Sequence, residues 1–284
     1  MQRHGATPVT QNRWVAEMDI PYKLYKGDCL EIMPTLEAGS VDAIITDLPY
    51  GTTACAWDEI IPFEPMWEQV KRLLKPDGVF VTTASQPFTS ALVMSAAKIF
   101  KYEWIWEKAR PTGFQFAKFA PMREHENILV FYSSPPTYNP ELTKKDKPIK
   151  KRYPTVKSKS SNMTSNKKAE GNWTHTNPKT IIRIPQERGE HPTQKPVALF
   201  AYLIRTYTNP NDLVLDITMG SGTTIIAALL EGRRSIGIEQ DPKYFAIAEK
   251  RISQAALQPS LFHATQHSVN PTRADAPKKF DIFD

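Results

Sequence analysis

The sequence predicts an α/β fold built on a doubly wound parallel sheet. Short β-branched runs alternate with helical patterns from residue 22 to residue 254. The run at 41–46, VDAIIT, is apolar almost throughout, which is typical of a strand covered by helices on both faces. A glycine-rich turn at 217–224 joins another strand to a helix. Repeated strand–helix alternation needs crossover connections, and these produce parallel strands.

In the first half of the chain, each element follows from a local pattern. Residues 63–78 place Met66, Val70, Leu73 and Leu74 on one helical face, and the Pro-Asp-Gly at the end predicts a stop. Aromatic and charged residues alternate over 102–108, which predicts a strand paired with the apolar run at 126–132. The other predicted elements are strands 22–28, 41–46 and 79–85, and helices 29–36 and 88–99.

The second half resumes the alternation after a polar interruption. Its predicted elements are helix 196–208, strand 212–217, helix 223–232, strand 234–239 and helix 242–254. The polar stretch 133–190 is too long for an ordinary connection and predicts a functional insert. The predicted organisation is a flexible leader at 1–20, a first half at 21–132, the insert at 133–190, a second half at 191–256 and a flexible tail at 257–284.

Composition limits the class of protein. The 284 residues are 40% hydrophobic, enough for a sizeable core. The amino terminus lacks the apolar stretch of a signal peptide, and the run at 225–230 is too short to cross a bilayer. The two cysteines, Cys29 and Cys55, imply no disulfide framework. We therefore expect a cytoplasmic protein with no membrane partner.

The positive charge is concentrated in one segment. Residues 141–170 contain ten Lys or Arg and three acidic residues, a local excess of +7 in a chain whose net charge is +6. Composition alone favours a solvated, flexible loop. The alternative is an arm that neutralises phosphates, and its place in the chain has to decide between the two.

The glycine-rich turn predicts a nucleotide-like ligand. Gly220 and Gly222 let the backbone approach a ligand closely, and the following helix offers free N–H groups. Glu239 ends the next strand, where an acid accepts hydrogen bonds from ribose hydroxyls. A dinucleotide fingerprint wants glycine or alanine at position 225, which is Ile. Asp216 is a poor neighbour for a pyrophosphate, but it suits a sulfonium centre such as that of S-adenosylmethionine.

Four motifs together carry a family resemblance. They are GD at 27–28, DLPY at 47–50, HPTQKP at 191–196 and DITMGSGTT at 216–224. In this order they resemble the beta class of amino-group (N6-adenine/N4-cytosine) site-specific DNA methyltransferases. The resemblance implies a Rossmann-like methyltransferase sheet with circularly permuted motif order, and an insert that recognises the target sequence. The family's commonest tetrapeptide is Asp-Pro-Pro-Tyr, so Leu48 is a departure, tolerable because that position is thought to act through its main-chain carbonyl.

The chemistry of an exocyclic amine explains the tetrapeptide. The lone pair of the amine is delocalised into the base, so the nitrogen needs two acceptors to hold its hydrogens and aim it. Asp47 offers a carboxylate and Leu48 a carbonyl, and Pro49 stiffens the turn. Tyr50 offers a ring face to a base extruded from the duplex. If this segment stood alone, a turn cap at Asp47 and a core tyrosine would be the default interpretation.

The resemblance also assigns binding residues. For S-adenosylmethionine these are Asp28, Thr193, Lys195, Asp216, Gly220, Ser221, Gly222, Thr223 and Glu239. The basic segment and the loop at 107–124 are assigned to double-stranded DNA through Lys108, Arg110, Lys144, Lys145, Lys150, Lys151, Arg152 and Lys157. No metal is needed. His263 and His267 have a helix-compatible spacing but lack acidic or cysteine partners nearby, so a solvated tail is the preferred interpretation.

We therefore expect a DNA methyltransferase that acts on adenine N6. An Asp at the first position of the tetrapeptide favours adenine over cytosine N4 as a family tendency. Three alternatives stay open: the cytosine reaction, an RNA or small-molecule methyltransferase, and a non-catalytic DNA-binding module with a vestigial pocket. The resemblance also leaves open a homodimer and a partnership with a restriction enzyme.

Overall fold

The computed structural model describes residues 21–51, 58–152, 170–187 and 194–257. In chain order, the elements of the first half are β1 (Tyr22–Lys26), α1 (Cys29–Ile32), η1 (Met33–Thr35), β2 (Val41–Asp47), α2 (Phe63–Leu73), β3 (Leu74–Ala84), α3 (Phe88–Ser95), β4 (Phe100–Thr112), η2 (Phe114–Phe116) and β5 (Arg123–Phe131). Then follow β6 (Thr143–Arg152), β7 (Glu170–Thr176), β8 (Ile181–Arg183), α4 (Val197–Tyr207), β9 (Leu213–Asp216), α5 (Thr223–Leu230), β10 (Arg234–Glu239) and α6 (Pro242–Ala256).

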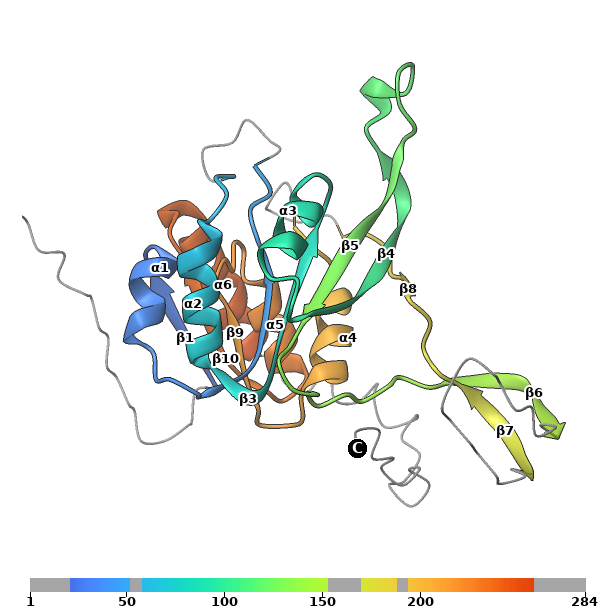
Figure 1. Ribbon diagram of the computed structural model, residues 1–284. Coiled ribbons are helices and arrows are strands. Elements are labelled where there is room, and N and C mark those ends of the chain that lie inside the picture. Colours follow the sequence, from blue (N-terminus) through green and yellow to red (C-terminus); the bar gives the residue numbers. More distant parts are fainter. Residues whose placement is uncertain (1–20, 52–57, 153–169, 188–193, 258–284) are drawn as a thin grey trace, which may run out of the picture.

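The main sheet has eight strands in the order β1-β10-β9-β2-β3-β5-β4-β8 (Figure 1). In this order the first five strands, β1, β10, β9, β2 and β3, run parallel to one another. β5 is antiparallel to both its neighbours, and β8 is parallel to β4. The sheet is therefore mixed at one end, where the predicted pairing of β4 with β5 is confirmed. The α/β fold class is also confirmed.

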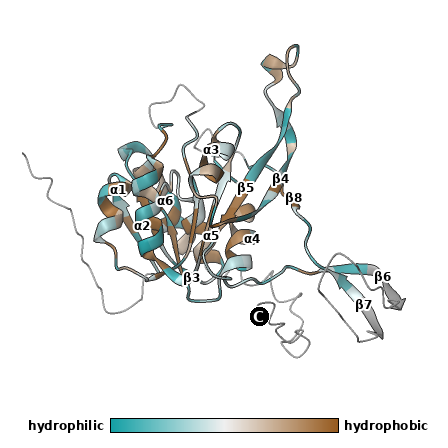
Figure 2. Cartoon of the chain, in the orientation of Figure 1, coloured by the Kyte–Doolittle hydropathy of each residue, from teal (hydrophilic) through white to brown (hydrophobic). Residues whose placement is uncertain are grey.

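Helices cover both faces of the sheet, as the apolar run in β2 predicts. Ile44 of β2 packs into a core cluster with side chains of α1, α2 and α3, whereas Ala43 and Ile45 pack into a second cluster with α4 and α5. Figure 2 shows hydrophobic residues gathered along the strands and hydrophilic ones on the outer helix surfaces. No helix in the described ranges has the length and apolar character that a membrane crossing requires.

The order of the strands creates a crevice between β2 and β9. From β2 the chain crosses by α2 to β3 on one side, and from β9 it crosses by α5 to β10 on the other side. The helices of these two crossovers lie on opposite faces of the sheet. In such sheets, ligands bind outside the carboxyl ends of the strands where the connections diverge. The carboxyl ends of β2 and β9 are Asp47 and Asp216.

Several element boundaries differ from the sequence prediction. The helix expected over 63–78 ends at Leu73, because Leu74 pairs with Val41 and starts β3 ahead of the Pro-Asp-Gly. The helix expected over 88–99 ends at Ser95, and that expected over 29–36 is one α-helical turn followed by a 3-10 turn.

The predicted insert is structured in part. β6 and β7 form a separate two-stranded antiparallel hairpin, which extends away from the main sheet in Figure 1. In contrast, β8 joins the main sheet, where Ile181 pairs with Ile105. Part of the segment assigned to target recognition therefore completes the sheet of the core domain.

The Tyr207 hydroxyl makes a buried polar contact in the core, and removing it measures how much that contact stabilises the fold. Its hydroxyl accepts from Trp104 Nε1 at 2.7 Å and lies 2.9 Å from the Tyr102 hydroxyl, and Tyr207 is 1% exposed. Tyr207→Phe strands the indole N–H of Trp104 in the core, so we expect a loss of about 1–3 kcal/mol in the free energy of unfolding. Urea denaturation measures it. Tyr138→Phe, at a 46% exposed neighbour, is the control; equal effects of both variants would contradict the account.

Candidate active site

One cleft contains both of the sites that the sequence predicts separately. It has a volume of about 760 Å³ and opens at the carboxyl ends of the parallel strands. Its lining includes the turn after β2, with Asp47, Leu48, Pro49 and Tyr50, and the turn after β9, with Asp216, Gly220, Ser221, Thr223 and, from β10, Glu239. The two turns are far apart in the chain but share one cavity.

Two threonines join the end of β2 to the turn after β9. The Thr46 hydroxyl donates to Asp216 Oδ1 at 2.7 Å, and the Thr218 hydroxyl donates to the Asp47 main-chain carbonyl at 3.0 Å. The two hydroxyls also lie 2.7 Å apart. Sequence reasoning missed both residues. The only indication in the sequence was their position: Thr46 precedes Asp47, and Thr218 follows Asp216 by two residues. Because β2 and β9 are adjacent parallel strands, their carboxyl ends bring the two threonines together.

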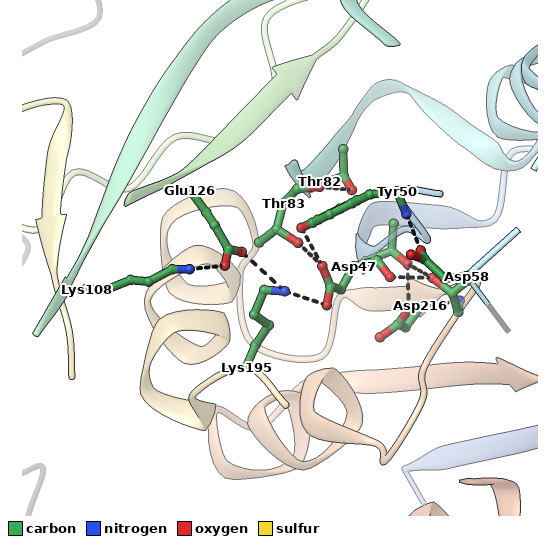
Figure 3. A network of polar contacts seen from close by, with 11 residues as sticks. Asp47, Tyr50, Asp58, Thr82, Thr83, Lys108, Glu126, Lys195 and Asp216 are labelled. Carbon is green, nitrogen blue, oxygen red and sulfur yellow. Dashed lines mark hydrogen bonds and ion pairs between the residues drawn. The ribbon is translucent and has the colours of Figure 1, made fainter. Parts of the chain in front are cut away.

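The carboxylate of Asp47 is held by three donors (Figure 3). Its Oδ1 accepts from the Thr83 hydroxyl and, at 2.9 Å, from the Tyr50 hydroxyl. Its Oδ2 accepts from Lys195 Nζ at 2.7 Å. Three donors on two oxygens fix the orientation of the carboxylate. The side chain keeps 24% of its surface exposed, toward the cleft.

Lys195, which its motif assigns to the cofactor, lines the cleft and pairs with two acids there. Its ammonium lies between Asp47 and Glu126, 3.3 Å from Glu126 Oε2. It also lies over the Tyr50 ring, 5.5 Å from the centroid. Burial lowers the pKa of Lys195, but Asp47, Tyr50 and Glu126 outweigh it and hold that pKa well above the ordinary value.

Lys108 also departs from its predicted role. Its ammonium pairs with Glu126 Oε1 at 2.6 Å, and only 10% of its side chain is exposed. The residue therefore neutralises a buried acid and is not presented to phosphates. Burial raises the pKa of Glu126, but the charges of Lys195 and Lys108 outweigh it and hold that pKa below the ordinary value. Sequence reasoning missed Glu126, whose only signal is an acid at the polar end of β5.

Tyr50 is fixed in position by its neighbours. Its ring stacks on Phe88 with the centroids 5.4 Å apart, and its main-chain N–H donates to Asp58 Oδ1 at 2.7 Å. The same oxygen accepts from Gly51 N at 2.9 Å, so Asp58 caps the turn. Burial and the nearby Asp47 charge raise the pKa of Tyr50 well above its usual value, so its hydroxyl stays protonated and donates.

The glycine turn has the geometry expected of a ligand-binding loop. Gly220 and Gly222 have φ values of +51° and +83°, which favour glycine. The Gly220 N–H donates to Glu239 Oε2 at 2.9 Å, and Asp241 N donates to Oε1 at 2.8 Å. A side chain at Gly222 would meet Ile252, because its Cβ would lie 2.8 Å from that residue's Cδ1. The turn therefore depends on glycine both for its backbone and for its packing on α6.

Asp216 is buried at the end of β9. It is 2% exposed, and its Oδ1 accepts from the Thr46 hydroxyl and from Thr218 N. Burial raises the pKa of Asp216 to about 6, although these hydrogen bonds oppose the shift. At neutral pH the carboxylate is charged in an environment that disfavours charge.

The remaining predicted residues are distributed as follows. Asp28 is exposed, lines the cleft, and caps α1 by accepting from Leu30 N at 2.7 Å. Arg110 and Lys144 are exposed, and Lys145 is half-buried. Lys150, Lys151 and Arg152 belong to the β6 strand, with only their backbone described, while Thr193 and Lys157 lie outside the described residues. In the described part of the chain, no group of acidic, histidine and cysteine side chains is arranged to hold a metal.

Most of the chain is similar to known proteins of one family. A family model described as DNA methylase matches residues 41–250. The chain is 28% identical over 279 residues to the type II methyltransferase M.HinfI of Haemophilus influenzae, covering 88% of this chain and 73% of that protein. It is 29% identical over 265 residues to the type II methyltransferase M2.MboI of Moraxella bovis, covering 82% and 88%.

Solved structures agree with the sequence comparison. The M1.HpyAVI–SAM complex superposes with a TM-score of 0.55 at 26% identity, covering 81% of this chain and 99% of that one. The cytosine-N4-specific PvuII DNA methyltransferase superposes with a TM-score of 0.56 at 18% identity, covering 84% and 92%. The second similarity concerns the fold alone.

The buried Asp216 predicts a measurable dependence of stability on pH. Its pKa is raised from 3.8 to about 6, so its destabilising effect is absent below pH 4, grows as the pH rises to 6, and is constant above that. Asp216→Asn keeps an oxygen that accepts from Thr46. Since each unit of pKa corresponds to about 1.4 kcal/mol, we expect the variant to be more stable than wild type by about 2–3 kcal/mol at pH 7 and equally stable at pH 4.

Urea denaturation from pH 4 to pH 7 measures this difference. Asp77→Asn, at an exposed position on β3, is the matched control and should change the free energy of unfolding by less than about 0.5 kcal/mol. A constant difference between Asp216→Asn and wild type across this range would contradict the account.

Proposed function

Since this chain belongs to the DNA methylase family, we propose that it transfers a methyl group from S-adenosylmethionine to the N6 amine of adenine in double-stranded DNA. One observation carries the proposal: the Asp47 turn and the glycine turn line a single cleft. An amine bound at the first turn therefore faces a methyl donor bound at the second. When both reactants are bound in this way, the reaction step no longer carries the loss of translational and rotational entropy that an encounter in solution requires.

The residues of the glycine turn fit S-adenosylmethionine. Gly220 lines the cleft and has open space where a side chain would stand, so the backbone there can approach a ligand closely. Glu239 lies at the tip of the next strand, where it accepts from ribose hydroxyls in our proposal. Asp216 and Asp28 also line the cleft. When bound, the cofactor supplies an electrophilic methyl group, whose bond to sulfur breaks as the bond to the amine nitrogen forms. The M1.HpyAVI structure, named as a SAM complex, supports this assignment.

The residues of the first turn activate the amine. In our proposal, one amine hydrogen is donated to the Asp47 carboxylate and the other to the Leu48 carbonyl, so that the nitrogen lone pair points into the cleft. The Tyr50 ring, backed by Phe88, stacks on the extruded base. After methylation the nitrogen carries an extra proton, and Asp47 is the nearest base in the proposal to accept it and pass it to water.

Lys195 is a positioning residue in this scheme. Its ammonium touches Asp47 Oδ2, and Glu126 holds the ammonium from the other side. Together with Thr83, it holds the carboxylate in a fixed orientation. The positive charge of Lys195 also compensates the repulsion between the carboxylates of Asp47 and Asp216.

The choice of adenine over cytosine is supported by the Asp at the first position of the tetrapeptide. Cytosine N4 is the second candidate, because the same acceptors serve either amine and the cytosine-specific PvuII enzyme shares the fold. Single-molecule sequencing of DNA from cells that express the chain tests the choice. We expect N6-methyladenine at one short sequence. N4-methylcytosine without N6-methyladenine would move the assignment to cytosine, and unmethylated DNA would contradict the proposed activity.

Asp47→Asn tests the catalytic assignment. An amide offers one oxygen acceptor instead of two and carries no charge for the amine hydrogens, so we expect methyl transfer to fall at least ~100-fold, within the range that one preorganised group contributes. Binding of S-adenosylmethionine, followed by calorimetry, should stay near wild type. Asp77→Asn controls for the loss of an exposed carboxylate. Turnover retained in Asp47→Asn would remove Asp47 from the mechanism.

The β6–β7 hairpin is the proposed DNA-contacting arm of the insert. Its strand β6 carries Lys144, Lys145, Lys150, Lys151 and Arg152. Changing Lys144, Lys145, Lys150 and Lys151 to Gln should weaken duplex binding. The slope of log affinity against log salt should become shallower by about 0.9 for each phosphate contact removed. Fluorescence anisotropy at several salt concentrations measures both. Lys71→Gln, exposed on α2, is the control; an unchanged slope in the fourfold variant would make the hairpin a solvated element only.

A further inference from the structure

The hairpin between β4 and β5 carries an apolar tip far from the core. We call residues 109–123 the finger. It continues the two strands beyond the main sheet (Figure 1) and ends in the 3-10 turn η2. The tip is ordered by its own backbone, since Phe116 N donates to the Gly113 carbonyl at 2.9 Å and Ala120 N to the Phe116 carbonyl at 2.9 Å. In Figure 2 the turn at this tip is coloured as hydrophobic, in contrast to the strands below it.

Three phenylalanines are exposed on the finger. Phe114, Phe116 and Phe119 are 79%, 59% and 88% exposed, and no other phenylalanine of the described ranges is as exposed. Each such side chain is less favourable in water than it would be when buried. One exposed aromatic needs no explanation, but three in six consecutive residues form a patch that marks an interaction surface.

The charge of the finger indicates the kind of partner. Residues 109–123 contain no Asp or Glu, and their three charged residues, Arg110, Lys118 and Arg123, are basic and exposed. An apolar tip between cationic flanks suits a polyanion that offers flat apolar surfaces. Duplex DNA has both features, with phosphates on the outside and stacked bases within.

The finger stands at the edge of the active-site cleft. Thr112 and Arg123, at its base, line the same cleft as Asp47. Gln186, which also lines the cleft, holds the first strand of the finger through two hydrogen bonds. Its Nε2 donates to the Arg110 carbonyl at 2.6 Å, and its Oε1 accepts from Arg110 N at 3.1 Å. A DNA segment that delivers a base to Asp47 therefore has the finger beside it.

We infer that the finger is a wedge that enters the duplex beside the target base and occupies the space the base leaves. Extruding a paired base costs stacking and pairing energy in the duplex, and an aromatic side chain that stacks on the neighbouring bases restores part of it. The phenylalanines of the tip would do this in the duplex, while Tyr50 stacks on the base in the cleft. The inference rests on the proposed function, because it needs a base in the cleft.

Single-turnover methylation separates wedging from simple affinity. The variant Phe114→Ser/Phe116→Ser/Phe119→Ser is compared with wild type on two short unmethylated duplexes. Both contain the recognition sequence that the sequencing experiment identifies. In one the target base is paired, and in the other an abasic site replaces its partner. We expect the variant to react at least tenfold more slowly on the paired duplex and within about twofold of wild type on the abasic one. Met94→Ser, at a 74% exposed apolar residue on α3, should react like wild type on both.

Other outcomes overturn the inference. An equal loss of rate on the two duplexes would mean that the finger adds affinity without assisting extrusion. An unchanged rate would mean that the finger takes no part. A wild-type dimer that dissociates in the triple variant, measured by light scattering, together with equal losses on both duplexes, would assign the tip to a contact between two copies of the chain. If wild type methylates neither duplex, the proposed function fails, and that result is distinct from the other three.

Discussion

The site depends on the hydrogen bonds that join the carboxyl end of β2 to that of β9. Thr46 and Asp216 are 170 residues apart in the chain, yet their side chains are 2.7 Å apart, and Thr218 returns the contact to the Asp47 carbonyl. These bonds fix one turn against the other, so the cleft has a set width. They also place two acids near each other, and the protein stabilises each differently. Asp47 is paired with a lysine, whereas Asp216 has hydroxyl and amide donors and a raised pKa.

Charge compensation organises the wall of the cleft beside Asp47. Lys108, Glu126, Lys195 and Asp47 alternate in sign along a chain of contacts between 2.6 and 3.3 Å (Figure 3). Removing one member of a buried ion pair leaves its partner uncompensated, which is far more costly than losing a surface pair. Lys108 belongs to β4, Glu126 to β5, and Lys195 lies two residues before the start of α4. These ion pairs therefore link the strands that bear the finger to the catalytic turn.

Local patterns were enough to predict most strands and helices, and the two turns, because each depends on its own residues. VDAIIT is a strand in any buried sheet, and Gly220 and Gly222 suit a turn with positive φ. Contacts between distant segments were beyond such patterns. No local pattern indicates what Thr46, Thr83 and Glu126 contact, and Lys195 was assigned through its motif without knowledge of the acids beside it. The three-residue strand β8 shows the same limit, since only the exposed edge of β4 makes it a strand.

The central claim is that the cofactor and the target amine share one cleft across the β2–β9 junction. A crystal structure with an S-adenosylmethionine analogue, in which an amine replaces the methyl-bearing sulfonium, tests it most directly. The account predicts the ribose of the analogue at Glu239 and its amine pointing across the junction toward Asp47. An analogue bound outside the cleft, or with its amine turned away from the 47–50 turn, would contradict it.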